Sequence, residues 1–417
     1  EKIDKIPVIT PASTKWAWSG EVKKWTNFKP FVIDGKTKFS FDIYNNYDIF
    51  IINFDLLKKF IIILKSFHIN LVIVDECQKI KSITAIRSKL TKEIARNASR
   101  VLLLTGTLML SRPCELFNSL NLIDSMTWND WYFFTKKYCA GHQSRWGYDF
   151  SGASNIEELK NKISKYYIRH IKEDVLKNLP SKIFIDIPIE LDDISRFKYT
   201  LALYELKEYL KIIKKKDNFE IAKSLQAEKL VKLNELRQIA TEGKISTAEE
   251  LIESIIDSEQ KVIVFSSYNK PLKKLNIKFK NSSVLLTGEI PELSRKQMIE
   301  SFQNDKKIQV FLCGFLSGGV GITLTAAANV IFMDFPWNPS DINQAYSRAH
   351  RIGNKAESVN IYQIIARDTV DTKIKFILED KQNLINQMFD KKINSNQSSL
   401  SLVNDVIGEI EKDIKKE

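Results

Sequence analysis

The chain has 417 residues, of which 44% are hydrophobic and 27% charged, a balance that is typical of folded globular proteins and excludes global disorder. Lysine and arginine number 63 against 51 acidic residues, so the formal charge is +12, which favours a polyanionic partner. No apolar run approaches the roughly 18 residues that cross a bilayer, and we expect neither a membrane partner nor a secretory signal.

Residues 1–110 alternate short apolar runs with helical stretches. Runs such as LVIV and VLLL are followed at once by polar residues, which is typical of buried parallel strands with loops at their carboxyl ends. Segments 20–25 and 55–67 can form the crossover helices of a βαβ arrangement. The strands expected here are Pro7–Ile9, Phe31–Ile33, Ile49–Asn53, Leu71–Val74 and Val101–Thr105.

Residues 111–255 are mostly helical in pattern, and we interpret them as a linking or protruding bundle. From Lys261 the βαβ rhythm returns. The expected strands are Val262–Phe265, Ser283–Leu286, Val310–Cys313, Val330–Asp334 and Ser358–Gln363. The fold class is therefore α/β, with two lobes built on parallel sheets and joined by helical inserts. The expected domains are 1–125, 126–255, 256–390 and a charged tail, 391–417.

An acidic pair, Asp75-Glu76, follows the apolar run at 71–74. Two adjacent carboxylates at the end of a strand can divide two tasks. Asp75 can hold Mg²⁺ through water, and Glu76 can polarise a water molecule that attacks a γ-phosphate. A solvated acidic turn is the simpler interpretation of an isolated pair, but the preceding strand favours the chemical one.

The next apolar run leads into Thr105-Gly106-Thr107. Small hydroxyl residues beside a glycine can connect the acidic pair to a neighbouring lobe. A plain turn between a strand and a helix explains the same residues equally well.

A third segment, 310–354, holds several special residues close together. Gly318, Gly319 and Gly321 form a loop in which backbone N–H groups can approach phosphates. Asp334 ends a strand and is followed by a rigid Pro336–Pro339 turn. Gln344, Arg348 and Arg351 then have the spacing of one helix face, and the two arginines are suited to stabilising a γ-phosphate.

In order, PASTKW, IINFDLL, VDECQ, LLLTGT, VIVFSSY, LSGGVGITLTAA, DFPWNP and QAYSRAHRIG resemble the SWI/SNF-type branch of the superfamily 2 helicase-related ATPases. The resemblance covers about residues 7–390. The insert at 135–163 and the following IRHIKEDVLKNLPSK are most similar to the annealing-helicase (HARP-like) subgroup.

The resemblance implies two RecA-like lobes that close on ATP and Mg²⁺, and double-stranded or branched DNA that is contacted mainly through its phosphates. Thr105, Thr107 and the three loop glycines would serve the nucleotide, and Arg348 and Arg351 match the arginine fingers. By position, Pro11, Ala12, Ser13, Asn53, Ser317 and Trp337 match DNA-contacting elements. The four cysteines, without paired spacing, predict a reducing intracellular location, which is cytoplasmic or nucleoid-associated, or nuclear in a eukaryote.

The family also has a phosphate loop, G-x-x-x-x-G-K-[ST], ahead of the PASTKW motif. The present sequence has none there. Gly35-Lys36-Thr37 is a decoy, because the first glycine of the pattern would fall on Pro30, which has no N–H to donate. Three explanations are open: the chain is a fragment, a separate polypeptide supplies the loop, or catalysis has been lost.

The expected function is an ATP-dependent double-stranded DNA translocase, an ATP hydrolase that remodels or re-anneals DNA in repair or replication. The alternative is an ATP-independent DNA-binding clamp or subunit that keeps the motor fold.

Overall fold

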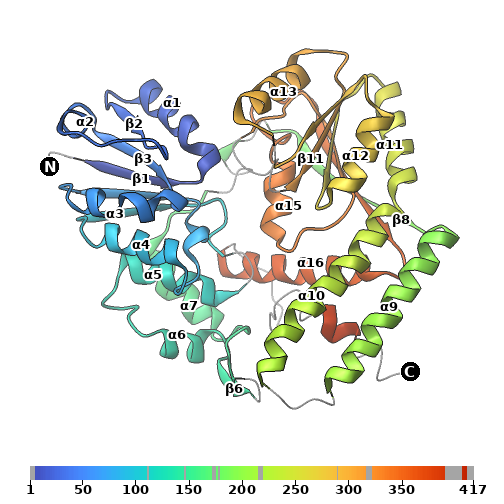
Figure 1. Cartoon of the computed structure of the whole chain (residues 1–417), viewed down its shortest axis with the longest axis horizontal. Helices are drawn as coiled ribbons and strands as arrows, with labels where there is room; N and C mark the ends of the chain where they lie inside the picture. The colour runs from blue at the N-terminus through green and yellow to red at the C-terminus, as the bar shows by residue number, and fades with distance from the viewer. Residues whose placement is uncertain are drawn as a thin grey trace. The chain divides into compact units, whose positions relative to one another are not determined.

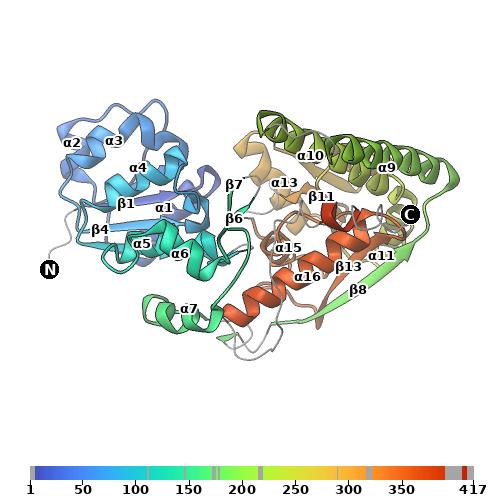
Figure 2. The same ribbon diagram turned by 90° about the horizontal axis from the view of Figure 1, so that it is seen from below.

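A computed structural model shows an α/β chain that divides into two compact units, built mainly from Glu1–Ile168 and Arg169–Asn386 (Figures 1 and 2). The structure describes residues 5–109, 112–144, 147–170, 175–176, 179–214, 219–288, 290–315, 322–389 and 406–410.

The first unit is built on a five-stranded sheet in the order β2-β3-β1-β4-β5, with every neighbouring pair parallel. Each strand lies within one residue of the expected one at either end. The continuous apolar runs predicted these strands because both faces of the sheet are covered. The strands are β1 (Ile6–Thr10), β2 (Pro30–Val32), β3 (Ile49–Asn53), β4 (Leu71–Asp75) and β5 (Arg100–Leu104).

Different helices cover the two faces of this sheet. Ile9 and Val74 pack with side chains of α3 and α4, whereas Val8 packs with Val22 of α1 on the other face. After β5 the chain forms smaller helices and an antiparallel hairpin, β6 with β7. The remaining elements are α1 (Lys15–Trp25), α2 (Phe41–Asn46), α3 (Leu57–Lys65), α4 (Ile86–Ala95), α5 (Phe117–Ile123), α6 (Trp131–Tyr138), β6 (His142–Ser144), β7 (Gly147–Asp149) and α7 (Ile156–Ile163).

The second unit is built on a six-stranded parallel sheet in the order β10-β11-β9-β12-β13-β8. Its edge strand β8 contains the short extended piece that Pro180 and Pro188 predict at Ile183–Ile187 within the mostly helical range. The strand is longer than that piece at both ends and pairs along the whole of β13. The strands are β8 (Ser181–Ile189), β9 (Val262–Ser266), β10 (Ser283–Leu286), β11 (Val310–Gly314), β12 (Asn329–Phe332) and β13 (Ser358–Ala366).

Helices also cover both faces of the second sheet. Side chains of α13 and α15 pack on one face with Phe265 and Phe332, and those of α11 and α12 pack on the other with Val264 and Ile331 (Figure 1). The long helices α9 and α10 lie side by side (Figures 1 and 2). The helices are α9 (Asp193–Lys214), α10 (Phe219–Glu242), α11 (Ile245–Asp257), α12 (Asn269–Lys278), α13 (Glu292–Asn304), α15 (Pro339–Tyr346) and α16 (Val370–Phe389).

The range 126–255, expected as inserts between the lobes, is shared between the two units. Residues up to Ile168 belong to the first unit and those from Arg169 to the second. The expected domain boundaries at 125, 255 and 390 stay predictions.

Two further properties bear on the environment of the chain. In the part that the structure describes, no helix is both long and apolar enough to cross a membrane. Cys77, Cys114, Cys139 and Cys313 are all buried free thiols.

A hydrophobic cluster joins α9, α10 and α16, and one buried hydroxyl lies within it. Tyr199 of α9 is 2% exposed, and its oxygen accepts a hydrogen bond of 2.7 Å from the backbone N–H of Val370. Val370 is the first residue of α16, where backbone N–H groups have no partner within the helix. The tyrosine therefore both fills the cluster and caps the helix.

Tyr199→Phe should lower the free energy of unfolding of the second unit by about 1–3 kcal/mol, because it leaves the Val370 N–H buried without an acceptor. Tyr204→Phe is the matched control, since Tyr204 lies on the same helix and is 61% exposed. Urea unfolding of the three proteins measures the difference. Equal stability of the two variants would contradict the prediction.

Candidate active site

Polar residues end three neighbouring strands of the first sheet. Thr10 is the last residue of β1, Asn53 of β3 and Asp75 of β4. Thr10 stands opposite Asn53 in the parallel register, and β1 lies between the other two strands. The carboxyl edge of the sheet, where ligands bind in folds of this kind, therefore gathers three of the polar residues of the unit.

The carboxylate of Asp75 is held by three donors. Its Oδ2 accepts hydrogen bonds of 2.9 Å from the Thr10 hydroxyl and from the indole N–H of Trp18. Its Oδ1 accepts one of 2.9 Å from the N–H of Glu76. Thr10 and Trp18 were missed by the sequence interpretation, because nothing in a motif shows which side chain reaches a carboxylate some 60 residues away.

This geometry fits a water-mediated contact with Mg²⁺. A carboxylate oxygen has two lone pairs, so Oδ2 of Asp75 is filled by its two donors whereas Oδ1 keeps one free position. Asp75 is also half-exposed, which leaves room for a water molecule of a metal shell. Among the described residues, no group of three or more His, Cys, Asp or Glu side chains could hold a metal on its own.

Glu76 adopts a left-handed backbone conformation, with φ of +51°, which is uncommon for a residue with a side chain. Its carboxylate accepts a hydrogen bond from Gln78 Nε2. The Oε1 of Gln78 in turn accepts one of 2.7 Å from the Thr105 hydroxyl, and that hydroxyl accepts one of 2.9 Å from the N–H of Thr107. The acidic pair is therefore connected to Thr105–Thr107 within this unit through the Gln78 side chain, and the expected connection to a neighbouring lobe stays a prediction.

The three residues after β1 form a short surface segment. Pro11 is buried, whereas Ala12 and Ser13 begin a 3₁₀ turn and are exposed. The Thr14 N–H closes this turn by donating to the Pro11 carbonyl at 3.1 Å. The Thr14 hydroxyl lies 2.6 Å from that of Thr10 and can donate to it, because the proton of Thr10 is given to Asp75. The expected DNA-contacting segment is thus joined to Asp75 through two hydroxyl groups.

In the decoy loop at Asp34–Thr37, the polar groups form hydrogen bonds with one another. The Asp34 carboxylate accepts hydrogen bonds from the Lys36 N–H at 2.8 Å and from the Thr37 hydroxyl at 3.0 Å. These bonds, that from Lys36 first, lower the pKa of Asp34. The loop is a closed turn after β2, which agrees with rejecting it as a phosphate loop.

In the second unit, one expectation about the arginines is wrong. Gln344 lies on α15 and is half-buried, but the helix ends at Tyr346, so Arg348 and Arg351 do not continue its face. The carbonyl of Arg348 accepts a hydrogen bond of 2.9 Å from the N–H of Leu324, and a continued helix would need that carbonyl for residue 352. The chain therefore turns at Ser347.

Both arginines bind to the short stretch 322–323. Arg348 is 7% exposed, and its Nη1 donates to the Ile322 carbonyl at 3.5 Å. Arg351 donates to the Thr323 hydroxyl at 2.8 Å, and burial lowers the pKa of its guanidinium. The preceding residues Ser317, Gly318, Gly319 and Gly321 lie outside the described residues.

Asp334 has a different environment from Asp75. It lies two residues after β12 and is 2% exposed. Its Oδ2 accepts hydrogen bonds from the Ser266 hydroxyl at 2.6 Å and the Ser267 N–H at 2.9 Å. Its Oδ1 accepts one from the Ser267 hydroxyl at 2.5 Å and lies 3.7 Å from Nη2 of Arg237. The end of β9 is thereby fixed to the chain after β12.

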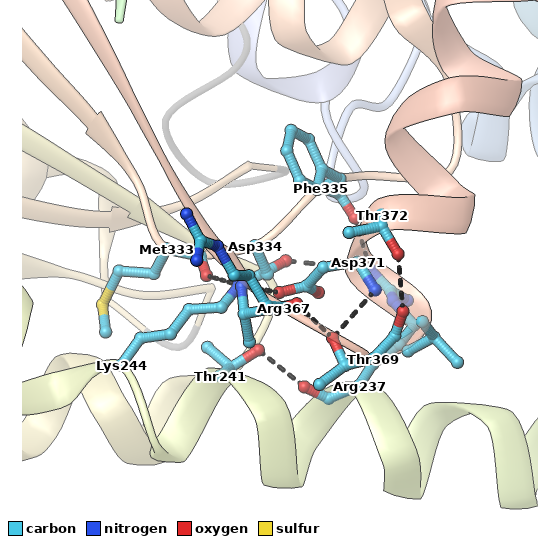
Figure 3. A network of polar contacts seen from close by, with 12 residues as sticks. Arg237, Thr241, Lys244, Met333, Asp334, Phe335, Arg367, Thr369, Asp371 and Thr372 are labelled. Carbon is cyan, nitrogen blue, oxygen red and sulfur yellow. Dashed lines mark hydrogen bonds and ion pairs between the residues drawn. The ribbon is translucent and has the colours of Figure 1, made fainter. Parts of the chain in front are cut away.

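Two buried cations that sequence reasoning missed complete this network (Figure 3). Arg237 of α10 and Lys244, just before α11, are 2% and 0% exposed. Lys244 donates to the Met333 carbonyl at 2.8 Å and forms an ion pair with Asp371 of α16. Two positive and two negative groups thus neutralise each other inside the second unit.

Comparison with known proteins places these features in a family. The family model "SNF2-related domain" matches residues 1–245, which is more than half of the chain, and "Helicase conserved C-terminal domain" matches 243–353. The chain is 30% identical over 392 residues to "DNA annealing helicase and endonuclease ZRANB3" of Bos taurus, covering 90% of this chain and 35% of the relative.

Other relatives and structures are similar over most of the chain. A Caenorhabditis elegans homolog of SWI/SNF-related matrix-associated actin-dependent regulator of chromatin subfamily A-like protein 1 is 29% identical over 402 residues, 91% of this chain and 55% of the relative. The Sulfolobus solfataricus SWI2/SNF2 ATPase core, solved in complex with dsDNA, covers 93% of this chain and 82% of its own at 24% identity, with a TM-score of 0.41. The chain spans about a third to a half of these curated relatives. From the extent of the family match, the chain belongs to the SNF2-related family, in which a helicase C-terminal domain follows the SNF2-related domain.

Proposed function

We propose that the chain is the core of an ATP-dependent motor on double-stranded or branched DNA, which translocates and so remodels or re-anneals the DNA. The observation that supports this most strongly is that the family match extends over both units. Asp75 ends β4 and Glu76 follows it directly, while Arg348 and Arg351 are held in the second unit. Acidic and cationic groups of these two kinds are those that nucleotide hydrolysis requires.

Each residue has a proposed task in hydrolysis. Mg²⁺, when bound, neutralises phosphate charge, and Asp75 would hold its water shell through the free position on Oδ1. Glu76 would orient the attacking water, with its carboxylate aimed by Gln78. Arg348 and Arg351 would stabilise the charge on the γ-phosphate. On motif positions alone, we assign Gln344 to catalysis and Thr105, Thr107, Gly318, Gly319 and Gly321 to binding the nucleotide.

The proposal of a DNA substrate is supported by charge and by relatives. The formal charge of +12 favours a polyanion, and one relative is a DNA annealing helicase by name. Ala12 and Ser13 are exposed and would contact phosphates beside Pro11. Asn53, Ser317 and the turn that contains Trp337 are the further proposed DNA elements.

A second candidate is an ATP-independent DNA clamp. It is favoured by the formal charge of +12, which attracts DNA phosphates without any nucleotide. This candidate predicts that DNA affinity is the same with and without ATP, whereas the motor predicts that ATP changes it.

Glu76→Gln should lower DNA-stimulated ATP hydrolysis by about 10²-fold or more, because the amide cannot accept a proton from water. ATP binding should persist, since the side chain keeps its size. The rate is measured on the complete natural protein that contains these residues. Glu93→Gln, at an exposed position on α4, is the matched control. Absence of DNA-stimulated hydrolysis in the unmutated protein would refute the motor and favour the clamp.

Trp18→Phe should lower the rate of hydrolysis about tenfold and raise the Mg²⁺ concentration needed for half the maximal rate. The reason is that Asp75 loses one hydrogen bond to a charged acceptor, which is worth about 1.5–3 kcal/mol. Trp16→Phe is the control, because Trp16 is 59% exposed on the same helix. An unchanged Mg²⁺ dependence in Trp18→Phe would show that Trp18 only fills space.

Ser13→Glu should weaken binding of duplex DNA roughly tenfold, since it places a negative charge beside the proposed phosphate contact. Fluorescence anisotropy across a salt series measures the effect, with Ser125→Glu, another exposed position of the same unit, as the control. The unmutated chain should lose about 10³-fold in affinity between roughly 50 and 200 mM salt if about six phosphates are contacted. Equal loss in both variants would argue against this segment as the contact.

A further inference from the structure

A buried arginine of α10 contacts the turn that leads into α15. The turn, residues 336–339, is called the PWNP turn below. Arg237 Nη2 donates at 2.5 Å to the carbonyl of Phe335, 98 positions later in the chain. The central carbon of the same guanidinium lies 4.1 Å from the centroid of the Trp337 ring. Arg237 therefore binds the entrance of the PWNP turn through its edge and stacks on the turn through its face.

The requirements of this position match arginine and not lysine. A guanidinium is planar, so it can stack on an aromatic ring while its N–H groups donate sideways. Here one side chain contacts the Trp337 ring, the Phe335 carbonyl and Asp334 together. A lysine ammonium could replace the charge but not the combination of stacking and directed donation.

The Arg237 guanidinium is itself held in place by a neighbouring side chain of α10. Its Nη1 donates to the Asn234 side chain, one turn earlier in α10, at 3.2 Å. The Tyr268 hydroxyl donates to the Asn234 carbonyl at 3.2 Å, and burial raises the pKa of Tyr268 to about 12, so this donor stays protonated at neutral pH. The guanidinium therefore has a defined position relative to α10.

The Trp337 side chain is packed against other residues of the second unit and does not present an open ring. It is half-buried and packs against the cluster formed by α9, α10 and α16, and Arg237 covers its ring. A side chain in this setting is suited to anchoring a turn, whereas stacking on a DNA base requires an open ring face. The exposure that DNA needs would have to come from other parts of the turn, such as the backbone and Asn338.

We propose that Arg237 is a positioning residue for the PWNP turn, and that Trp337 is the anchor through which it acts, so that α10 sets where the turn meets DNA. This inference rests on the proposed DNA-binding function. Arg237 touches neither DNA nor nucleotide in this role. The competing explanation is that Arg237 only neutralises the buried Asp334.

The test compares Arg237→Lys with Arg295→Lys. Arg295 is a matched control in the same unit, because its guanidinium donates to the Ile290 and Gly288 carbonyls and the substitution equally keeps the charge. In protein labelled with 5-fluorotryptophan, the Trp337 resonance is assigned by its absence in Trp337→Phe. Arg237→Lys should shift or broaden that resonance, whereas Arg295→Lys should leave it unchanged. An unchanged resonance in Arg237→Lys overturns the proposal whether or not DNA binds.

DNA affinity is the second measurement. Arg237→Lys should weaken duplex binding about fivefold, as expected if the freed turn holds its binding geometry about a fifth of the time. The slope of affinity against salt should stay the same, because no phosphate contact is lost. The double variant Arg237→Lys/Trp337→Ala should bind duplex DNA as weakly as Trp337→Ala alone, because both substitutions act through the same contact. A reduced salt slope would instead make Arg237 a direct phosphate ligand and overturn the positioning role.

The remaining outcomes separate the two proposals. If the Trp337 resonance changes but DNA affinity equals that of Arg295→Lys, the turn is positioned for something other than DNA and this inference is overturned. If the unmutated chain binds no duplex DNA at all, the proposed function fails and the inferred role of Arg237 in DNA binding is overturned with it. The fluorine spectra then still decide whether Arg237 holds Trp337 in place.

Discussion

A parallel sheet that is covered on both faces places its polar groups mainly where its strands end, and the rest of this structure depends on that constraint. In β3, Ile49 to Ile52 are at most 5% exposed before the strand reaches Asn53. In β9, Val262 to Phe265 are fully buried before Ser266. Because all strands of a sheet run the same way, these terminal polar residues gather at one edge. The chemistry of each unit therefore follows from where its apolar runs stop.

A carboxylate at such an edge has to be given donors, and its exposure and neighbouring charges, not the number of donors, separate a reactive group from a structural one. Asp75 accepts three hydrogen bonds, is half-exposed and keeps a free lone pair. Asp334 accepts three as well, but it is 2% exposed and also faces the Arg237 guanidinium. The same residue type at the same kind of edge can thus take a ligand in the first unit, whereas in the second it joins β9 to the PWNP turn.

The sequence predicted what depends on neighbours in the chain. Continuous apolar runs located the strands, and the acidic pair was correctly placed at the end of β4. The spacing of Gln344, Arg348 and Arg351 predicted one continuous helix face, and this prediction is wrong. The Arg348 carbonyl accepts a hydrogen bond from the N–H of Leu324 and not from the next turn of a helix. The partners of the carboxylates could not be predicted, because an arginine within a helix of mixed composition has the pattern of a solvated face. Only the folded chain brings Arg237 to Phe335.

The buried charges of the second unit raise the question of why they are kept. Well-packed apolar residues could replace a balanced ion-pair network without loss of stability, so stability alone does not explain it. An apolar contact, however, leaves a turn free to rotate, since dispersion is not directional. A stacked guanidinium with directed N–H groups fixes both the distance and the orientation of the Trp337 ring. Precise orientation is what a turn leading into α15 needs if the residues beyond it are to meet a ligand in one geometry.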